Sequence, residues 1–323
     1  MSSPLPRLSV VIPNYNHARY LPTCLGAVLR QSVQPFEVIV IDDASTDNSV
    51  EVIEQFAREH PIVRLHRNEK NRGVVFNMNK GLLELAQGDY VYMAAADDEV
   101  QPGHFEKTLS LLAQHPQAAL CCTIGDWREI ETGLNWHVGV GMGDQPCFIS
   151  PQEMARLERA GKLFIASNSA VFNRRTLNEV GGFVPELRWH CDWFAIYTSG
   201  FRHGVCFVPE PLAVANIHAT SFYSVGSKQD EHRRVLERML ELLNSSAYAD
   251  VMPFIRDSGA LFLFGRPMFK LMRSRPEFRH FLTPTFLRKN LWHTFKVDMK
   301  RIAPAWVGNL YIKLTGQRAK KRD

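Results

Sequence analysis

Acidic, amide and aromatic side chains gather at three points in the first hundred residues, each directly after a short run of β-branched residues. These points hold Pro13, Tyr15 and Asn16, then Asp42 and Asp43, and then Asp97 and Asp98. Carboxylates bind divalent cations and accept hydrogen bonds from the N–H of a base or the hydroxyls of a ribose. The chemistry that these residue types indicate is the binding of a nucleotide with a metal ion.

Asp97 and Asp98 follow a hydrophobic run, where burying an ionised carboxylate is unfavourable unless an opposite charge compensates it. Mg²⁺ and Mn²⁺ are suitable partners, because they take one or two protein carboxylates together with substrate phosphates and water. The simpler alternative is that Asp97, Asp98 and Glu99 cap the helix expected after Pro102. The second acidic pair on a neighbouring strand end favours the metal site, with Asp98 as the ligand.

The pair Asp42 and Asp43 also has a simpler interpretation as a turn that caps the following helix. Capping needs one side-chain acceptor, and Ser45, Thr46 and Asp47 already offer it. One acid therefore remains available for a pyrimidine or a ribose. The ring of Tyr15 could stack on a base, although a half-exposed loop aromatic is the simpler alternative.

The usual phosphate-binding loops are absent from the sequence. No Gly-x-Gly-x-x-Gly follows the first apolar run, and no P-loop motif occurs anywhere in the 323 residues. The usual dinucleotide-binding and P-loop interpretations are therefore excluded. The charge of a diphosphate has to be met in another way, and a metal at Asp98 is the natural one.

The elements that position these groups alternate between strands and helices. Strands are expected at residues 8–12, 36–41, 62–65, 90–93 and 118–122, with helical apolar spacing between them. This alternation predicts an α/β fold with a mostly parallel sheet that helices cover on both faces. Ligands of such sheets bind at the carboxyl ends of the strands, which is where the three groups lie.

At this point the sequence resembles the family 2 glycosyltransferases, which have the GT-A fold. The segments that carry the resemblance are residues 8–16, 38–49, 71–90 and 96–98, followed by 180–183, 191–192, 208–211 and 218–221. The resemblance covers about residues 7–223. It implies a Rossmann-like mixed, mostly parallel sheet flanked by helices, with a nucleotide-sugar half at 1–125, an acceptor-side half at 126–223 and a helical C-terminal extension at 224–323.

The resemblance also implies roles for individual residues. Pro13, Tyr15 and Asn16 would form the nucleotide-binding loop, Asp43 would contact the base, Asp97 the ribose, and Asp98 the metal that bridges the diphosphate. Asp192 falls where the family has its general base, and His218 resembles a position that approaches the metal in some relatives, although a structural histidine is equally compatible.

Two departures from the family pattern affect these assignments. Cys191 stands where the family usually has a Glu before the catalytic Asp. Met78 stands where an Arg often precedes Asn79, so Asn79 joins the donor-binding residues without that phosphate-side Arg. Lys80 could substitute for it, or could be an ordinary surface lysine.

The implied activity is inverting transfer of a sugar from a nucleoside-diphosphate sugar to an acceptor hydroxyl, with Mn²⁺ or Mg²⁺, in cell-surface polysaccharide or glycan biosynthesis. The acceptor would be a glycan or a lipid-linked molecule. Two alternatives stay open: a non-catalytic nucleotide-sugar-binding subunit of an assembly complex, and a sugar nucleotidyltransferase. The latter usually has a Gly-rich basic loop, which Pro13 and its neighbours do not form.

The charge of the chain is uneven. From Leu271 to Asp323 there are 13 Lys and Arg and three acidic residues, so this segment carries +10, and the rest carries −5, since the whole carries +5. The six cysteines lack paired spacing, which indicates a reducing compartment. No signal peptide or membrane span is apparent, so the expected location is cytoplasmic, with peripheral binding at the inner face of the cell membrane as an option.

The basic segment contains one amphipathic pattern within residues 285–302. Its apolar stripe consists of Leu291, Trp292, Phe295, Met299 and Ile302, with Lys289, Lys296 and Lys300 beside it. Such a helix would suit an anionic membrane interface. The alternative is that the stripe packs against the catalytic domain. This alternative is favoured because packed amphipathic helices are far commoner than membrane-bound ones. Nucleic acid is excluded as a partner, because the body is acidic and no known binding motif occurs.

Overall fold

The structure, a computed structural model, describes residues 5–217 and 229–302. Within them, ten strands form one sheet, in which β3, β2, β1, β4, β9, β6, β10 and β5 are successive neighbours, while β7 pairs with β6 and β8 with β10. The strands are β1 Leu8–Asn14, β2 Glu37–Asp42, β3 Val63–Arg67, β4 Tyr90–Met93, β5 Glu99–Val100, β6 Leu120–Glu129, β7 Leu134–Val138, β8 Cys147–Ile149, β9 Val171–Asn173 and β10 Val205–Ile217. The five strands expected from the sequence are confirmed.

The N-terminal half of the sheet is parallel, and its register brings the strand ends together. β1 lies between β2 and β4, with Asn14 opposite Asp42 and Val11 opposite Met93. β9 then runs antiparallel to β4 and β6, and β6 pairs in parallel with the long β10. The sheet is therefore mixed, and the residues that follow β1, β2 and β4 emerge at one edge.

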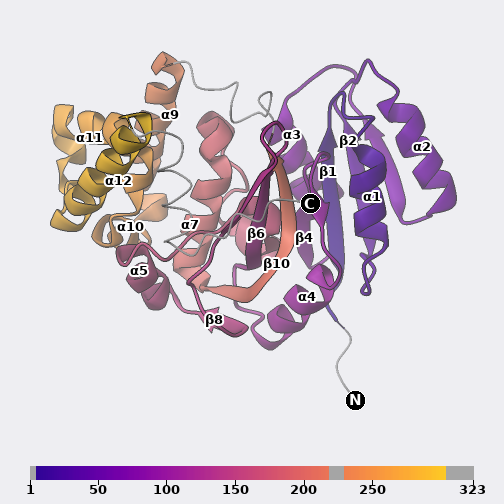
Figure 1. The fold of residues 1–323 in the computed structure, drawn as a ribbon, viewed down its shortest axis with the longest axis horizontal. Coiled ribbons are helices and arrows are strands. Elements are labelled where there is room, and N and C mark those ends of the chain that lie inside the picture. The colour runs from indigo at the N-terminus through magenta and orange to yellow at the C-terminus, as the bar shows by residue number, and fades with distance from the viewer. Residues whose placement is uncertain (1–4, 218–228, 303–323) are drawn as a thin grey trace.

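Side-chain alternation along β1 supplies two hydrophobic cores. Val10 and Ile12 pack with Phe105 and other residues of one core, whereas Val11 joins the core on the other face with Val75. The helices of this half are α1 Leu21–Leu29, α2 Ser49–Glu59, α3 Val74–Asn79, which continues as the π-helix η1 Lys80–Leu85, and α4 His104–Gln114. Helices thus cover both faces of the sheet (Figure 1).

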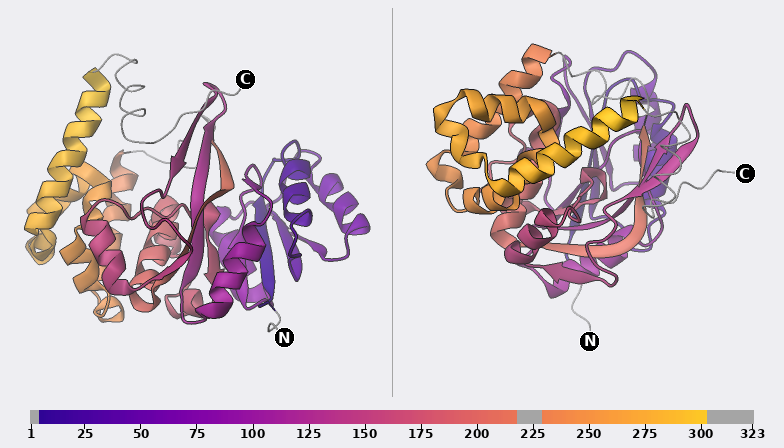
Figure 2. Two further views of the ribbon diagram at one scale, coloured as in Figure 1. Left: turned by 60° about the horizontal axis from the view of Figure 1, so that its bottom comes forward. Right: turned by 60° about the vertical axis from the view of Figure 1, so that its left-hand side comes forward.

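The remaining helices lie beyond β6 and β10 (Figures 1 and 2). They are α5 Pro151–Arg159, η2 Ser167–Ser169, α6 Arg174–Glu179, η3 Pro185–His190, α7 Cys191–His203, α9 Gln229–Leu243, η4 Ser246–Tyr248, α10 Met252–Ser258, η5 Ala260–Phe264, α11 Gly265–Ser274, η6 Pro276–Phe281 and α12 Pro284–Ile302. Leu236 of α9 and Met268 of α11 belong to the same core as Phe194 of α7. The C-terminal helices therefore pack into the core that contains α7, and the expected helical C-terminal extension is confirmed.

Residues 125–150 are rich in glycine and contain paired strands. β7 runs back antiparallel to the second half of β6, and β8 pairs with the start of β10. The glycines of this segment lie in and between these strands.

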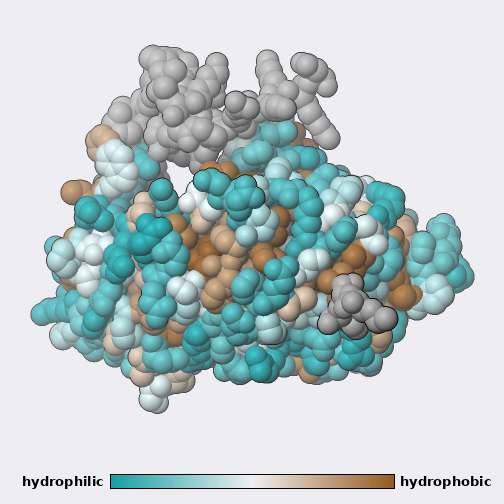
Figure 3. All heavy atoms as spheres, turned by 90° about the horizontal axis from the view of Figure 1, so that it is seen from below, coloured by the Kyte–Doolittle hydropathy of each residue, from teal (hydrophilic) through white to brown (hydrophobic). Residues whose placement is uncertain are grey.

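The orientation of α12 corrects one expectation. Leu291, Trp292 and Phe295 are 73%, 58% and 53% exposed, so this part of the expected stripe does not pack against the rest of the protein, whereas the side chains of Met299 and Ile302 lie outside the described residues. The opposite side, with Phe286 and Lys289, is buried. Figure 3 shows the molecule from below, where hydrophilic side chains surround hydrophobic patches in the middle of the face. None of the described helices is both long enough and apolar enough to cross a bilayer.

Candidate active site

The acidic residues after β4 do not cap the next helix. α4 begins at His104 with Gly103 as its N-cap, and no side chain makes a capping hydrogen bond there. Glu99 instead begins β5, whose partner is β10. The capping alternative for Asp97 and Asp98 is therefore wrong.

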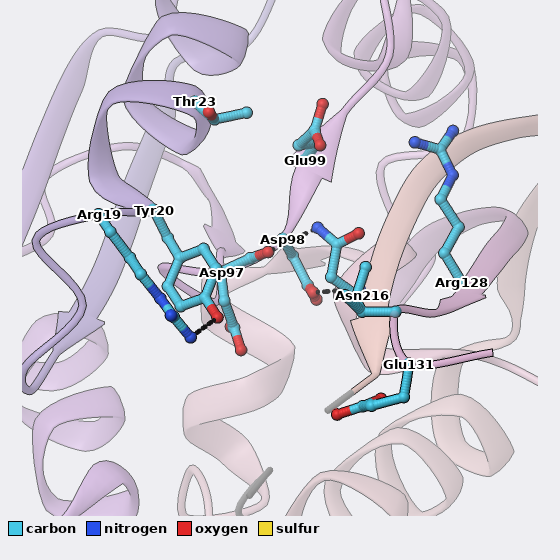
Figure 4. Close-up of a pocket in the computed structure, with 10 residues that line it drawn as sticks. Arg19, Tyr20, Thr23, Asp97, Asp98, Glu99, Arg128, Glu131 and Asn216 are labelled. Atoms are coloured by element: carbon cyan, nitrogen blue, oxygen red, sulfur yellow. Dashed lines mark hydrogen bonds between the residues drawn. The ribbon is translucent and has the colours of Figure 1, made fainter. Parts of the chain in front are cut away.

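Asp98 is held by two elements that are distant in sequence. Its Oδ1 accepts a hydrogen bond from the backbone N–H of Asn216 at 3.0 Å, and its Oδ2 accepts one from Asn168 Nδ2 at 3.2 Å. Asn216 Nδ2 also donates to the Asp97 carbonyl oxygen at 2.7 Å (Figure 4). The end of β10 and the turn η2 thus fix the carboxylate.

The electrostatic state of Asp98 suits a cation. Burial, followed by the charge of Asp97, raises the pKa of Asp98 to about 8, although the hydrogen bonds from Asn216 and Asn168 act in the opposite direction. Ionised Asp98 therefore lacks full compensation, and a divalent cation would supply it.

A metal ion bound by Asp98 would need further ligands from outside the chain. Among residues 5–217 and 229–302, no three His, Cys, Asp or Glu side chains cluster closely enough to hold a metal ion. An ion bound by one or two carboxylates, substrate phosphates and water fits this arrangement. His218, the other expected ligand, lies outside the described residues.

A cleft of about 620 Å³ opens beside Asp98. Its lining residues are Arg19, Tyr20, Thr23, Asp97, Asp98, Glu99, Arg128, Ile130, Glu131 and Asn216. Arg19 precedes α1 and Arg128 lies on β6, on opposite sides of Asp97 and Asp98 in the view of Figure 4, and the Arg128 guanidinium also donates to Asp126 Oδ2 at 3.0 and 2.8 Å. The cleft therefore combines carboxylates for a cation with guanidinium groups that suit phosphate oxygens.

Sequence reasoning missed Arg19, Arg128 and Asn216. Arg19 follows Asn16 closely in the sequence, and this closeness already indicated that Arg19 lies near the same edge of the sheet. Arg128 and Asn216 could not be located this way, because only the parallel pairing of β6 with β10 places Arg128 opposite Asn216.

The second acidic pair holds backbone segments together. Asp42 accepts hydrogen bonds from Asn14 Nδ2 at 2.9 Å and from the N–H of Ser45 at 3.1 Å. Asp43, only 3% exposed, accepts bonds from the N–H groups of Arg72 and Gly73, each at 2.8 Å. The pair therefore ties β2 to β1 and to residues 68–73.

Ionised Asp43 is stabilised by these contacts. Burial acts to raise its pKa, but hydrogen bonds from Arg72, Asn68, Gly73 and Asn77 outweigh burial, so the pKa lies below its ordinary value. Asp43 is thus a buried carboxylate whose hydrogen-bond donors belong to residues 68–77. Its expected contact with a base stays a prediction.

The loop after β1 presents one aromatic ring. Tyr15 is 44% exposed, whereas Asn16 turns its side-chain oxygen inward, to the N–H groups of Thr46 at 2.8 Å and Asp47 at 3.3 Å. Asn16 has φ = 57°, a left-handed conformation that asparagine tolerates better than most residues. Asn16 therefore fastens the loop to residues 46 and 47, and both Tyr15 and Asn16 are exposed.

Asn79 joins two distant parts of the chain. Its Nδ2 donates to the Phe183 carbonyl at 2.7 Å, and its Oδ1 accepts from the Phe183 N–H at 2.9 Å. These two bonds fasten α3 to the turn at residues 181–183. The structure gives the side chain this structural task, and its role in donor binding stays a prediction.

Asp192 lies in the first turn of α7. Its Oδ1 accepts a hydrogen bond from the N–H of Trp193 at 2.7 Å. Burial raises the pKa of Asp192 above the ordinary range, although hydrogen bonds from the Ser167 hydroxyl and Trp193 partly oppose this effect. A carboxylate with a raised pKa accepts a proton more readily, as a general base must.

The turn η2 connects Asp192 with Asp98. Ser167 bonds to Asp192, and the next residue, Asn168, bonds to Asp98. Tyr92 fixes the turn by donating to the Asn168 carbonyl at 2.7 Å, and His104 Nε2 lies 3.1 Å from the Ser169 carbonyl. Two carboxylates with raised pKa values are therefore held by neighbouring residues of one anchored turn, which the sequence motifs did not reveal.

Comparisons with known proteins identify the family that the chain matches. Residues 9–181 match the family model described as glycosyl transferase family 2. The uncharacterized glycosyltransferase YibD of Escherichia coli K12 is 38% identical over 130 residues, which are 40% of this chain and 37% of YibD. The chain thus spans little more than a third of that relative.

Two solved structures share the fold. Staphylococcus aureus TarS 1-349 in complex with UDP-GlcNAc superposes with a TM-score of 0.62 at 17% identity, over 88% of this chain and 79% of TarS 1-349. The mannosyltransferase PcManGT of Pyrobaculum calidifontis, in complex with GDP-Man and Mn²⁺, gives a TM-score of 0.53 at 18% identity, over 90% and 88%. Both likenesses show a GT-A fold.

Proposed function

The chain belongs to glycosyl transferase family 2, and from this premise we propose that it moves a sugar from a nucleoside-diphosphate sugar to an acceptor hydroxyl, with inversion at the anomeric carbon. The observation that carries the proposal is the pair of carboxylates that η2 connects. Asp98 lies in a cleft with two flanking arginines, and Asp192 has the raised pKa of a base.

The donor diphosphate would occupy the cleft beside Asp98. Arg19 and Arg128 would contact its oxygens, while Asp98 would hold Mn²⁺ or Mg²⁺ against it. The metal, when bound, neutralises the negative charge that develops on the departing diphosphate. TarS and PcManGT support this placement, because the one binds UDP-GlcNAc and the other GDP-Man with Mn²⁺ on the same fold.

The transfer step would use Asp192. The acceptor hydroxyl gives its proton to the Asp192 carboxylate as its oxygen forms a bond to the anomeric carbon. The bond from that carbon to the diphosphate oxygen breaks on the opposite side, and the electron pair leaves with the nucleoside diphosphate. Separating the base from the metal ligand leaves Asp192 free to take the proton.

The acceptor we propose is a glycan or a lipid-linked molecule of cell-surface polysaccharide biosynthesis. Chondroitin synthase of Pasteurella multocida, 31% identical over 137 residues that make up 41% of this chain and 14% of the synthase, supports a polysaccharide product.

A panel of nucleotide sugars tests the function. We expect one donor, such as UDP-GlcNAc or GDP-Man, to raise the melting temperature with Mn²⁺ and to release nucleoside diphosphate slowly by hydrolysis. Binding without turnover, whatever acceptor is added, would instead indicate a non-catalytic subunit. Release of pyrophosphate from a nucleoside triphosphate and a sugar phosphate would indicate a nucleotidyltransferase.

A further inference from the structure

One side of α12 is apolar and faces away from the protein. This outer face consists of Leu287, Leu291, Trp292 and Phe295, which are 42%, 73%, 58% and 53% exposed. The rings of Trp292 and Phe295 stack, with centroids 5.7 Å apart and planes inclined by 18°. Single exposed apolar residues are ordinary, but a contiguous group with two aromatic rings indicates an interaction site.

The helix cannot turn this face inward, because a buried charge pair fixes its rotation. Lys289 Nζ donates to Glu158 Oε1 at 2.5 Å and to the Ser258 carbonyl at 3.3 Å. It also lies 4.2 Å from the centroid of the Phe262 ring. Lys289 is on the opposite side of the helix from Leu291, so rotating the outer face into the core would strip Glu158 of its cation. The exposure is thus built into the packing.

Two basic side chains, those of Arg288 and Lys296, lie at the outer face. Arg288 lies on the same side of the helix, and Lys296 Nζ lies 5.2 Å from the centroid of the Trp292 ring. The acid on that side, Asp298, bonds to Arg266 at 2.6 Å. In the sequence, residues 303–323 carry +4, from Lys313, Arg318, Lys320, Lys321 and Arg322 against Asp323, and they lie outside the described residues.

We propose that the outer face of α12 docks on an anionic lipid bilayer. Trp and Phe that lie between lysines and arginines have the composition of helices that bind in the headgroup region, where aromatic rings insert and basic groups contact anionic lipids. A second copy of the chain fits less well, because a self-complementary contact would bring these basic groups against one another.

The orientation of α12 relates docking on a bilayer to the position of the active site. α12 runs upward in the left view of Figure 2, and its C-terminal end lies on the same side of the molecule as the carboxyl ends of β1 and β2. A lipid-linked acceptor held in a bilayer at the outer face could extend across this side of the molecule toward Asp98, an advantage that rests on the proposed function.

Flotation of the full-length protein with vesicles tests the proposal. One set contains phosphatidylcholine alone, and the other also contains phosphatidylglycerol. We expect flotation with the anionic vesicles only, weakened by added salt because surface charges are screened. The double variant Trp292→Ser, Phe295→Ser should lose roughly tenfold in binding. Leu83→Ser, which alters a leucine that is 48% exposed in the other half, should bind like the wild type.

Several outcomes would overturn the proposal. The first is equal flotation of the wild type and the double variant. The second is equal flotation with the neutral and the anionic vesicles, and the third is the absence of flotation with either. A dimer seen by light scattering that the double variant abolishes, without any vesicle binding, would assign the face to a second copy. Retained donor hydrolysis by the double variant in solution separates this question from the proposed function, because flotation needs no catalysis.

Discussion

Lys289 Nζ lies 2.5 Å from Glu158 Oε1, which joins residues 131 positions apart in the sequence. The two residues are 8% and 1% exposed, and Tyr197 donates to the other carboxylate oxygen of Glu158 at 2.6 Å. One buried pair thus ties the C-terminal helix α12 to α5 and to α7, the helix that carries Asp192.

Lys289→Met should destabilise the protein by about 3–5 kcal/mol, because it leaves a buried carboxylate without its cation. Urea unfolding measures this loss. Burial already raises the pKa of Glu158 despite Lys289, and removal of the cation raises it further. A group with a raised folded-state pKa loses its stabilising contribution as pH rises, so the deficit should be larger at neutral than at acidic pH.

The double variant Glu158→Gln, Lys289→Met is the control for this pair. It has no buried charge at the site, so it should be more stable at neutral pH than Lys289→Met alone. A double variant as unstable as the sum of both single variants would mean that the two side chains act independently.

Asp98→Ala should remove the metal dependence of donor binding. We expect the affinity for the donor in Mn²⁺ to fall by about 10- to 100-fold, to the level that the wild type shows without the metal. Isothermal titration with and without Mn²⁺ checks this. Identical titrations of wild type and variant under both conditions would remove Asp98 from the metal site.

Asp192→Asn should stop transfer while it spares donor binding. The amide keeps the shape of the side chain but cannot accept the acceptor proton, so kcat should fall by about 10²- to 10⁴-fold with an unchanged donor Kd. Product formation with a competent acceptor measures the first quantity and donor titration the second. Transfer at the wild-type rate would show that another group is the base.

Ser167→Ala should move the acidic limb of the pH–rate profile to higher pH. Burial raises the pKa of Asp192, and the Ser167 hydroxyl partly opposes this, so removing the hydroxyl raises the pKa further. The base works when ionised, and activity should therefore be lost at a higher pH as the solution is acidified. Ser167→Thr, which keeps a hydroxyl, should restore the original limb, and a limb unchanged in Ser167→Ala would exclude the contact from catalysis.

Asn79→Ala distinguishes a structural role from donor contact. Loss of both bonds to Phe183 should cost about 1–3 kcal/mol of unfolding free energy, since the Phe183 N–H and carbonyl lose their partners. The donor Kd should stay unchanged if the clamp is the whole role of Asn79. Weaker donor binding in a variant of wild-type stability would support the role that the family resemblance implies.

Local apolar patterns predicted the strands and helices of the first half of the chain. Alternating apolar runs predicted β1 to β4, and parallel strands bring their carboxyl ends to one edge, so the neighbourhood of Asp98 followed from the sequence. The contacts of Asp98 did not, because Asn168 and Asn216 reach it through antiparallel pairing around β9 and through the length of β10.

The apolar periodicity of α12 predicted a helix but not which side it buries. An apolar stripe normally faces the core. Here the ion pair with Glu158 turns Lys289 inward, and Leu291 on the opposite side of the helix therefore points outward. The partner Glu158 lies in a different region of the sequence, so no local pattern could indicate it.

The core that α5, α7 and the C-terminal helices share limits how parts of related enzymes can be exchanged. A chimaera joined at residue 223 would place a foreign extension against Glu158 and Tyr197, which are matched to Lys289. Such a graft would have to carry the contacting faces of α5 and α7 with it. The extension could therefore be exchanged only together with α5 and α7, the helix that carries Asp192.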